Sequence, residues 1–72
     1  MRHEYNVLRA FDAVIPISGS TRRFDSGASF SYDTSQVGPT VTIEADMSVF
    51  LVDRSTIETC CEPNYIGPSA AN

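Results

Sequence analysis

Thr40-Val41-Thr42-Ile43-Glu44-Ala45 is the stretch that decides the fold, because its apolar and polar residues alternate strictly. Successive side chains of an extended chain point to opposite faces, so Val41, Ile43 and Ala45 share one face. The polar residues between them share the other. Such alternation is typical of a strand with one face in the core and one face in water. The sequence therefore predicts a half-buried strand over residues 40–45.

A second strand is predicted shortly afterwards, at Val49-Phe50-Leu51-Val52. All four of its side chains are apolar, which is typical of a strand that is buried on both faces and central in its sheet. The intervening Asp46-Met47-Ser48 fits two structures. It could form a tight hairpin connection, or it could provide the N-cap of one helical turn that runs into Phe50.

Further strands are predicted on both sides of this pair. Ala28-Ser29-Phe30-Ser31-Tyr32 alternates strictly and follows a turn at Asp25-Ser26-Gly27, where glycine can adopt a positive φ. Helical spacing also fits residues 5–11, but the β-branched run after them favours a strand. Pro16 places the segment around it at a sheet edge or a strand end. The remaining strand candidates are residues 5–11, 13–17, 22–24 and 56–60.

Five or six short strands with short loops and no good amphipathic helix predict an all-β (mainly β) protein. The expected architecture is a small barrel or a bent antiparallel sheet, with at most one short helical turn. An SH3-like barrel is the commonest solution for a chain of this size. Residues 1–62 are expected to form a single domain. Two prolines, a glycine and small residues predict a flexible tail over residues 63–72.

The charge of the chain argues against binding to nucleic acid. Its net charge is −4, with five arginines, no lysine and nine carboxylates, whereas affinity for phosphate backbones comes mostly from Lys and Arg. No apolar run is long enough to span a membrane. The segment Met1–Tyr5 lacks the apolar region of a signal peptide. A cytoplasmic location is therefore expected, or the virion if a phage encodes the protein.

Cys60-Cys61 is the first pair of residues to weigh as a reactive or metal-binding site. A structural metal site needs about four ligands, and the only histidine, His3, lies at the opposite end of the chain. Adjacent residues of a strand point to opposite faces, so one thiol is expected in the core and the other outside it. The sequence therefore predicts reduced cysteines, no metal site and no cofactor.

No catalytic motif can be found in the chain. It has no Gly-x-Ser-x-Gly segment and no glycine-rich phosphate loop, and a domain of this size can hardly shield a catalytic triad from water. The carboxylates match no calcium-binding loop and fit solvated turns and strand ends instead. Seven of them lie in the central and C-terminal parts of the chain: Asp25, Asp33, Glu44, Asp46, Asp53, Glu58 and Glu62. We expect that the protein is not an enzyme and has no small-molecule substrate.

Arg22, Arg23 and Phe24 are the best candidates for partner-binding residues. Two guanidinium groups and an aromatic ring beside a tight turn could hold an acidic or aromatic feature of another protein. The alternative is that Phe24 belongs to the core and that the arginines pair with Asp12 or Asp25. The sequence leaves both interpretations open.

A small non-enzymatic protein-interaction or structural accessory module is the function that fits these observations best. Such a module, for example a bacterial or phage assembly component, would dock on a larger protein or self-associate, which would also supplement a small core. The fifteen serines and threonines fit a face that abuts another protein as well as a solvated one. The alternative is an acidic inhibitor or regulator that occupies a basic site on another macromolecule. Clustering of the seven carboxylates on one face would favour the inhibitor, whereas an even scatter would favour the module.

Overall fold

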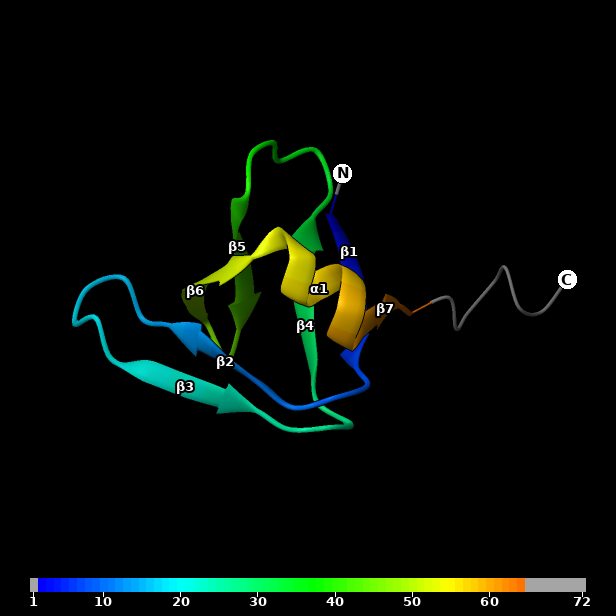
Figure 1. The fold of residues 1–72 in the computed structure, drawn as a ribbon, viewed down its shortest axis with the longest axis horizontal. Helices are drawn as coiled ribbons and strands as arrows, with labels where there is room; N and C mark the ends of the chain where they lie inside the picture. The colour runs from blue at the N-terminus through cyan, green and yellow to red at the C-terminus, as the bar shows by residue number, and fades with distance from the viewer. Residues whose placement is uncertain (1, 65–72) are drawn as a thin grey trace, which may run out of the picture.

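The computed structural model describes residues 2–64, which form one curved antiparallel sheet and a single short helix (Figure 1). The elements follow one another as β1 (Arg2–Val7), β2 (Phe11–Val14), β3 (Thr21–Phe24), β4 (Ser29–Asp33), β5 (Thr40–Ala45), β6 (Ser48–Asp53), α1 (Arg54–Cys60) and β7 (Cys61–Pro63). In space the strands are ordered β3-β2-β6-β5-β4-β1-β7, and each neighbouring pair is antiparallel. The prediction of a mainly β protein is confirmed.

The β5–β6 hairpin is the best-paired part of the sheet, and it confirms the strand predicted at residues 40–45. Six residue pairs join its two strands. Val41 and Ile43 are each only 1% exposed, whereas Thr42 and Glu44 remain partly accessible on the opposite face. The alternating pattern therefore places the apolar face of β5 in the core.

The connection between β5 and β6 is a hairpin turn and not the start of a helix. Ala45 and Ser48 pair as the last residues of the two strands, and only Asp46 and Met47 lie between them. Both have a positive φ, at 51° and 62°, which is the geometry of a type I′ turn and matches the twist of the strands. Glycine or asparagine suits these positions, whereas a methionine there costs conformational energy.

The sheet curls so strongly that aromatic rings from distant strands meet in one core. The ring centroids of Phe24 in β3 and Phe30 in β4 are 6.1 Å apart, although three strands lie between β3 and β4 in the sheet. Phe24 also stacks on Phe11 at 5.3 Å and meets Phe50 edge-on at 5.3 Å. The buried core residues are Val7, Phe11, Ala13, Phe24, Phe30, Tyr32, Val41, Ile43, Phe50, Val52, Ile57 and Cys61.

The sheet does not close into a barrel within the described residues, so the prediction of an SH3-like barrel is wrong and the bent sheet forms instead. The outermost strands, β3 and β7, are not paired with each other. β2 and β6 share only the pair Val14↔Leu51, and the β2–β3 hairpin therefore diverges from the remaining strands (Figure 1). The sheet has seven strands where five or six were expected, and the seventh, residues 61–63, lies at its edge.

The first strand lies further toward the N-terminus than predicted. A strand over residues 5–11 was expected, but β1 ends at Val7. The backbone N–H groups of Leu8 and Arg9 both donate to the carbonyl oxygen of Cys60, at 2.7 and 3.1 Å. The chain thus leaves the sheet before β2 begins. Its local alternation could not reveal this break, because the contacts come from the far end of the sequence.

Residues 56–60 belong to a helix and not to the predicted strand. α1 covers seven residues, about two turns rather than at most one. Ile57 is its only buried residue, and a single apolar side chain fits one side of a short helix as well as a strand. Asp53 precedes α1 with an extended backbone, as an N-cap residue does. No helix within residues 2–64 is long and apolar enough to cross a membrane.

The sheet continues slightly past the predicted domain boundary at residue 62. Pro63 is the last residue of β7 and pairs with Tyr5 of β1. The N–H group of Asn64 donates to the carbonyl oxygen of Glu4 at 2.8 Å. The rest of the predicted tail, residues 65–72, lies outside the described residues.

Candidate functional site

The three predicted partner-binding residues are divided between the core and the surface. Phe24 is 2% exposed and belongs to the aromatic core. Arg22 forms an ion pair with Asp46 and lies over the Phe24 ring, with its guanidinium carbon 4.9 Å from the ring centroid. Arg23 donates from Nε to Asp25 Oδ1 at 3.0 Å. These three side chains therefore do not form one continuous patch.

The two cysteines lie in different environments, and both are free thiols. Cys61 is buried, and this burial, together with the neighbouring Cys60, raises the pKa of the Cys61 thiol to about 11. Since the thiolate is the nucleophile and the metal ligand, Cys61 is held in its unreactive form near neutral pH. His3 lies exposed on β1. No group of three or more His, Cys, Asp or Glu side chains that could hold a metal occurs in residues 2–64.

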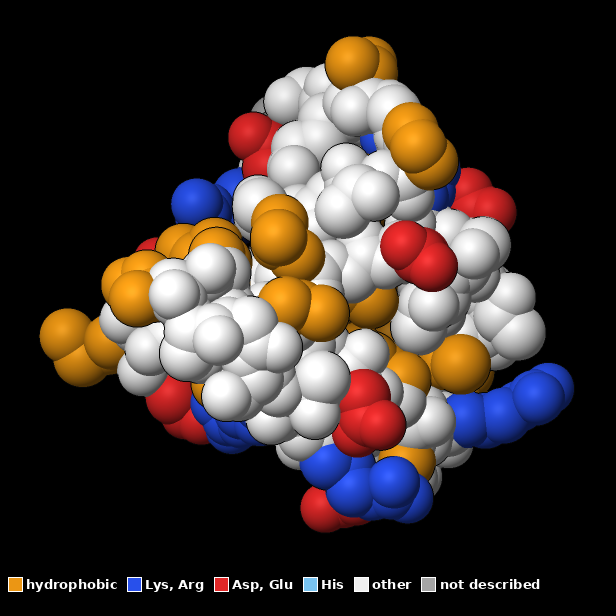
Figure 2. Space-filling view, turned by 60° about the vertical axis from the view of Figure 1, so that its left-hand side comes forward, with side chains coloured by type: hydrophobic (Ala, Val, Ile, Leu, Met, Phe, Trp, Pro, Cys, Tyr) orange, Lys and Arg blue, Asp and Glu red, His pale blue; other side chains and the backbone are white. Residues whose placement is uncertain are grey.

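Several carboxylates form hydrogen bonds or ion pairs that stabilise the structure around them. The hydroxyl and the N–H group of Ser35 donate to Asp33 Oδ1 at 2.7 and 3.0 Å, and these hydrogen bonds hold the pKa of Asp33 well below its usual range. The structure has three arginine–carboxylate ion pairs in its described part: Arg2–Glu44, Arg22–Asp46 and Arg23–Asp25. Blue and red side chains accordingly lie next to one another at several places in Figure 2. The carboxylates do not gather in one acidic patch on this face.

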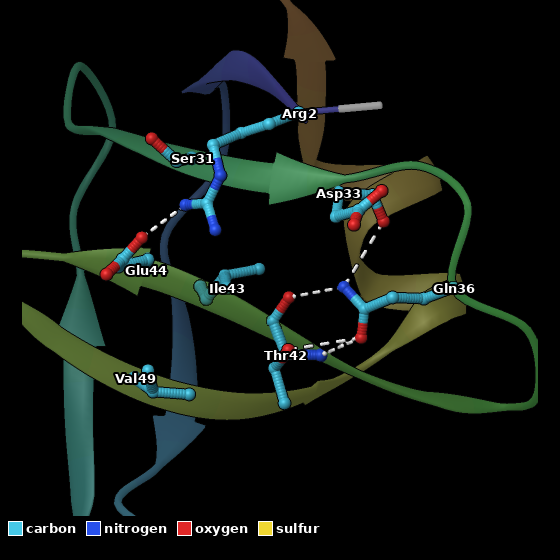
Figure 3. A pocket seen from close by; sticks show the side chains of 8 residues that line it. All are labelled: Arg2, Ser31, Asp33, Gln36, Thr42, Ile43, Glu44 and Val49. Carbon is cyan, nitrogen blue, oxygen red and sulfur yellow. Dashed lines mark hydrogen bonds and ion pairs between the residues drawn. The ribbon is translucent and has the colours of Figure 1, made fainter.

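A shallow polar hollow of about 90 Å³ lies on the outer face of the sheet (Figure 3). At one end of it, Arg2 pairs with Glu44. At the other end, Gln36 Nε2 donates to the carbonyl oxygen of Thr42 at 2.9 Å, and Gln36 Oε1 accepts from the Thr42 N–H at 2.9 Å. The Gln36 amide thus takes the place of a backbone peptide group beside β5. Because these groups bond to one another, they hold the sheet together and are not left to bind a ligand.

Arg54 stabilises the loop between β4 and β5 through hydrogen bonds from its guanidinium group. It donates from Nε to the carbonyl oxygen of Gly38 at 2.8 Å and from Nη1 to the Tyr32 hydroxyl at 3.3 Å. Its Nη2 donates to the carbonyl oxygen of Gln36. Sequence reasoning missed both Gln36 and Arg54, because most of their partners are backbone atoms that no residue pattern marks. Both residues have a structural role.

Four exposed apolar side chains lie toward one end of the sheet, and we name them the apolar tip: Val14, Ile17, Met47 and Val49. The antiparallel pair Val14↔Leu51 sets the end of β2 beside the first half of β6. The β2–β3 loop, which carries Ile17, and the β5–β6 turn, which carries Met47, therefore extend from the same end. Ile17 and Met47 are each 98% exposed. Figure 2 looks at the side of the molecule that carries the β2–β3 loop, and hydrophobic side chains protrude from it.

Ion pairing and uncharged residues surround the apolar tip. The Arg22–Asp46 pair joins β3 to the β5–β6 turn and leaves neither charge alone beside Met47. The exposed residues of the loop and of β6 include the serines Ser18, Ser20 and Ser48. An apolar centre with a polar rim is the usual composition of a protein–protein interface. The sequence carried a partial signal for this site, namely the apolar Met47 in a segment that fits a tight hairpin connection.

A groove of about 260 Å³ opens where β2 and β6 separate, and we name it the β2–β6 groove. It begins at the pair Val14↔Leu51, beyond which the two strands are no longer paired. The residues that line it include Asp12, Val14, Thr40, Leu51, Asp53 and Thr56. Val14 belongs to both the groove and the apolar tip, so the two features form one continuous surface.

No family model, curated protein or solved structure matches this chain. The function must therefore be argued from the geometry of the molecule. Two features of the described residues have been given no structural role above. These are the apolar tip and the β2–β6 groove beside it.

Proposed function

We propose that the protein is a small non-enzymatic module that docks on another protein through the apolar tip. The observation that carries this proposal is the exposure of Ile17 and Met47, each 98% exposed in connections at the same end of the sheet. Large apolar side chains that gather on a surface mark interaction sites more often than they serve stability. Truncating such residues is expected to weaken binding without weakening the fold.

The conformation of Met47 supports the same proposal. A methionine with a φ of 62° stands where glycine or asparagine would be favoured, and its side chain makes up for none of that cost by burial. Methionine is common at binding surfaces because its flexible side chain adapts to different partners. A contact with a partner would account for a methionine at this position.

The charges near the apolar tip favour a protein over other macromolecules. Arg22, which pairs with the turn, is neutralised by Asp46. Nucleic acids and anionic membranes are bound mainly through Lys and Arg that face them. The ion pairs distributed over the described residues also support the module over an acidic inhibitor. A role in a bacterial or phage assembly, in the cytoplasm or the virion, remains a prediction.

A comparison of two exposed sites tests the proposal. The double variant Ile17→Ser/Met47→Gly removes the two most exposed side chains of the tip. The matched control is Val37→Ser, which removes a side chain that is 88% exposed on the β4–β5 loop, outside the tip. Tagged wild-type and variant proteins are used to capture partners from the native host. The captured protein is then purified, and its Kd is measured by calorimetry.

The tip variant is expected to bind the purified partner at least ~30-fold more weakly, because two exposed anchors are each worth about 1 kcal/mol or more. The Val37→Ser protein is expected to bind like the wild type. Equal binding by the tip variant and the wild type would refute the proposal. So would an equal loss of binding in both variants.

A further inference from the structure

We infer that the β2–β6 groove receives an arginine side chain carried by the partner protein. This inference rests on the proposed function and specifies the chemistry of the partner at a second point of the same surface. Val14 links the two points, because it lies in the apolar tip and also lines the groove. The partner would therefore present apolar side chains to the tip and a cation a short distance from them.

The separation of the two strands brings two carboxylates to the groove. Asp12 lies two residues before Val14 and Asp53 lies two residues after Leu51, so both lie on the same side of the pair Val14↔Leu51. Both side chains line the groove and are exposed. Neither forms an ion pair with an arginine within the described residues. Arg23 is the cross-strand neighbour of Asp12 on β3, but its Nε donates to Asp25. The groove thus offers two exposed carboxylates that have no ion-pair partner within residues 2–64.

The rest of the groove suits the stem of a long basic side chain. Val14 and Leu51 supply apolar surface for methylene groups, while Thr40 and Thr56 supply hydroxyl acceptors. Arginine fits this arrangement better than lysine, since its planar guanidinium has five donors and can bond two carboxylates at once. The charge complementarity of the site therefore indicates a guanidinium.

The chain itself is a poor source of that arginine. Of its five arginines, four already have partners: Arg2, Arg22 and Arg23 in ion pairs and Arg54 in the loop contacts. Only the Arg9 side chain has no hydrogen-bond or ion-pair partner within residues 2–64. Each copy also carries a net charge of −4, which makes two copies repel one another. A different, more basic protein is the occupant that these charges favour.

A titration with a small probe tests the inference without the partner. N-acetyl-arginine amide is added to the 15N-labelled full chain, and backbone amide shifts are followed by NMR. N-acetyl-citrulline amide has nearly the same shape without the charge and serves as the control ligand. We expect saturable shifts for residues 12–14 and 51–53 with the arginine compound only. The expected Kd is on the order of 10 mM, because exposed ion pairs are weak.

The variant Asp12→Asn/Asp53→Asn should weaken this binding by roughly tenfold or more. Asparagine keeps the shape of both side chains and the N-cap preference at residue 53, so the fold should be retained. Absence of localised shifts in the wild type would overturn the inference, and so would equal shifts with the citrulline compound. Self-association of the wild type that Arg9→Gln abolishes would also overturn it, because a second copy would then be the occupant.

The failure of this inference can be distinguished from the failure of the proposed function. The tip variant Ile17→Ser/Met47→Gly leaves both carboxylates in place, so it should bind the arginine compound with the wild-type Kd. Loss of partner binding in that variant tests the tip alone. The shift pattern in the wild type, by contrast, tests the groove alone.

Discussion

The β5–β6 hairpin shares six residue pairs between its strands and lies inside the sheet, whereas the β2–β3 hairpin shares four and lies at the edge. β5 and β6 have strand neighbours on both sides. The β2–β3 hairpin is attached to the rest of the sheet through one residue pair, Val14↔Leu51, through its aromatic rings and through Arg22, which forms an ion pair with Asp46. The central hairpin is thus a scaffold fixed by backbone pairing, while the edge hairpin depends on a few side chains.

This difference explains where the proposed interaction surface lies. Binding elements are often drawn from the less stable parts of a fold, since they must adjust to a partner. The β2–β3 loop contributes Ile17 to the apolar tip, and the divergence of β2 from β6 opens the groove. The scaffold contributes the turn residue Met47. Four predictions test whether the two hairpins really differ in this way.

The largest effect is expected from Ile43→Ala in the scaffold. Ile43 is 1% exposed, and its truncation should lower the free energy of unfolding by about 2 to 5 kcal/mol, through lost transfer energy and a cavity. The total stability of a domain this small is expected near the low end of about 5 to 15 kcal/mol, so cooperative folding would be nearly lost. Urea denaturation followed by circular dichroism measures this change.

The neighbouring Glu44→Ala serves as the control for Ile43→Ala. Glu44 forms an exposed ion pair with Arg2, and such pairs contribute about 0 to 1 kcal/mol. If both variants lose stability equally, β5 is buried on both faces. The outer face would then be an interface in an obligate oligomer, and the scaffold would not fold alone.

The sequence predicted the central strand β5 well, and it predicted the end of β1, the helix α1 and the pairing of β2 with β6 poorly. The reason for this difference is physical. The strict alternation of residues 40–45 encodes burial directly, so it identified the strand and its buried face, while the hairpin at residues 46–48 was one of two structures left open. The break after Val7, the helix at residues 54–60 and the single pair between β2 and β6 depend on contacts with distant residues. Cys60 accepts from the turn after β1, and no local pattern marks such a contact.

The partner-binding role predicted for Arg22, Arg23 and Phe24 stays a prediction. Arg22, Arg23 and Phe24 attracted attention because charged and aromatic residues stood beside a turn. The curl of the sheet places Phe24 inside the core and pairs Arg22 with Asp46. The sequence alone could not show that the sheet bends far enough for β3 to meet β4.

The second prediction concerns Phe24→Leu in the edge hairpin. This change removes ring contacts with Phe11, Phe30 and Phe50 and should cost about 1 to 3 kcal/mol. Because the hairpin has little other attachment, amide hydrogen exchange should accelerate first in β2 and β3. Equal acceleration throughout β5 and β6 would show that the two hairpins unfold as one unit.

A smaller effect is expected from Arg22→Gln. The guanidinium carbon lies 4.9 Å from the Phe24 centroid and 5.2 Å from the Phe50 centroid, and the group also pairs with Asp46. These contacts are partly exposed, so their loss should cost about 0.5 to 1 kcal/mol. Arg23→Gln, which affects only a surface pair with Asp25, is the matched control. A larger loss from the control would contradict the role given to Arg22.

The smallest effect, and the one with the opposite sign, is expected from Met47→Gly. Glycine relieves the cost of a positive φ at this turn, but it also gives the unfolded chain more conformational freedom. The two terms nearly cancel, so the free energy of unfolding should rise by about 0 to 1 kcal/mol. Thermal melting would record an unchanged or slightly higher Tm, even though a side chain has been removed.

The substitution Val37→Gly, at a comparable exposed position, is the control for Met47→Gly. Val37→Gly also removes an exposed apolar side chain, but no positive φ is found at residue 37, so glycine there should be neutral or slightly destabilising. A fall in Tm of the Met47→Gly protein below that of the Val37→Gly protein would mean that Met47 supports the fold. An unchanged or higher Tm combined with weaker partner binding would mean that the methionine is retained for contact with the partner, at a turn where stability alone favours glycine.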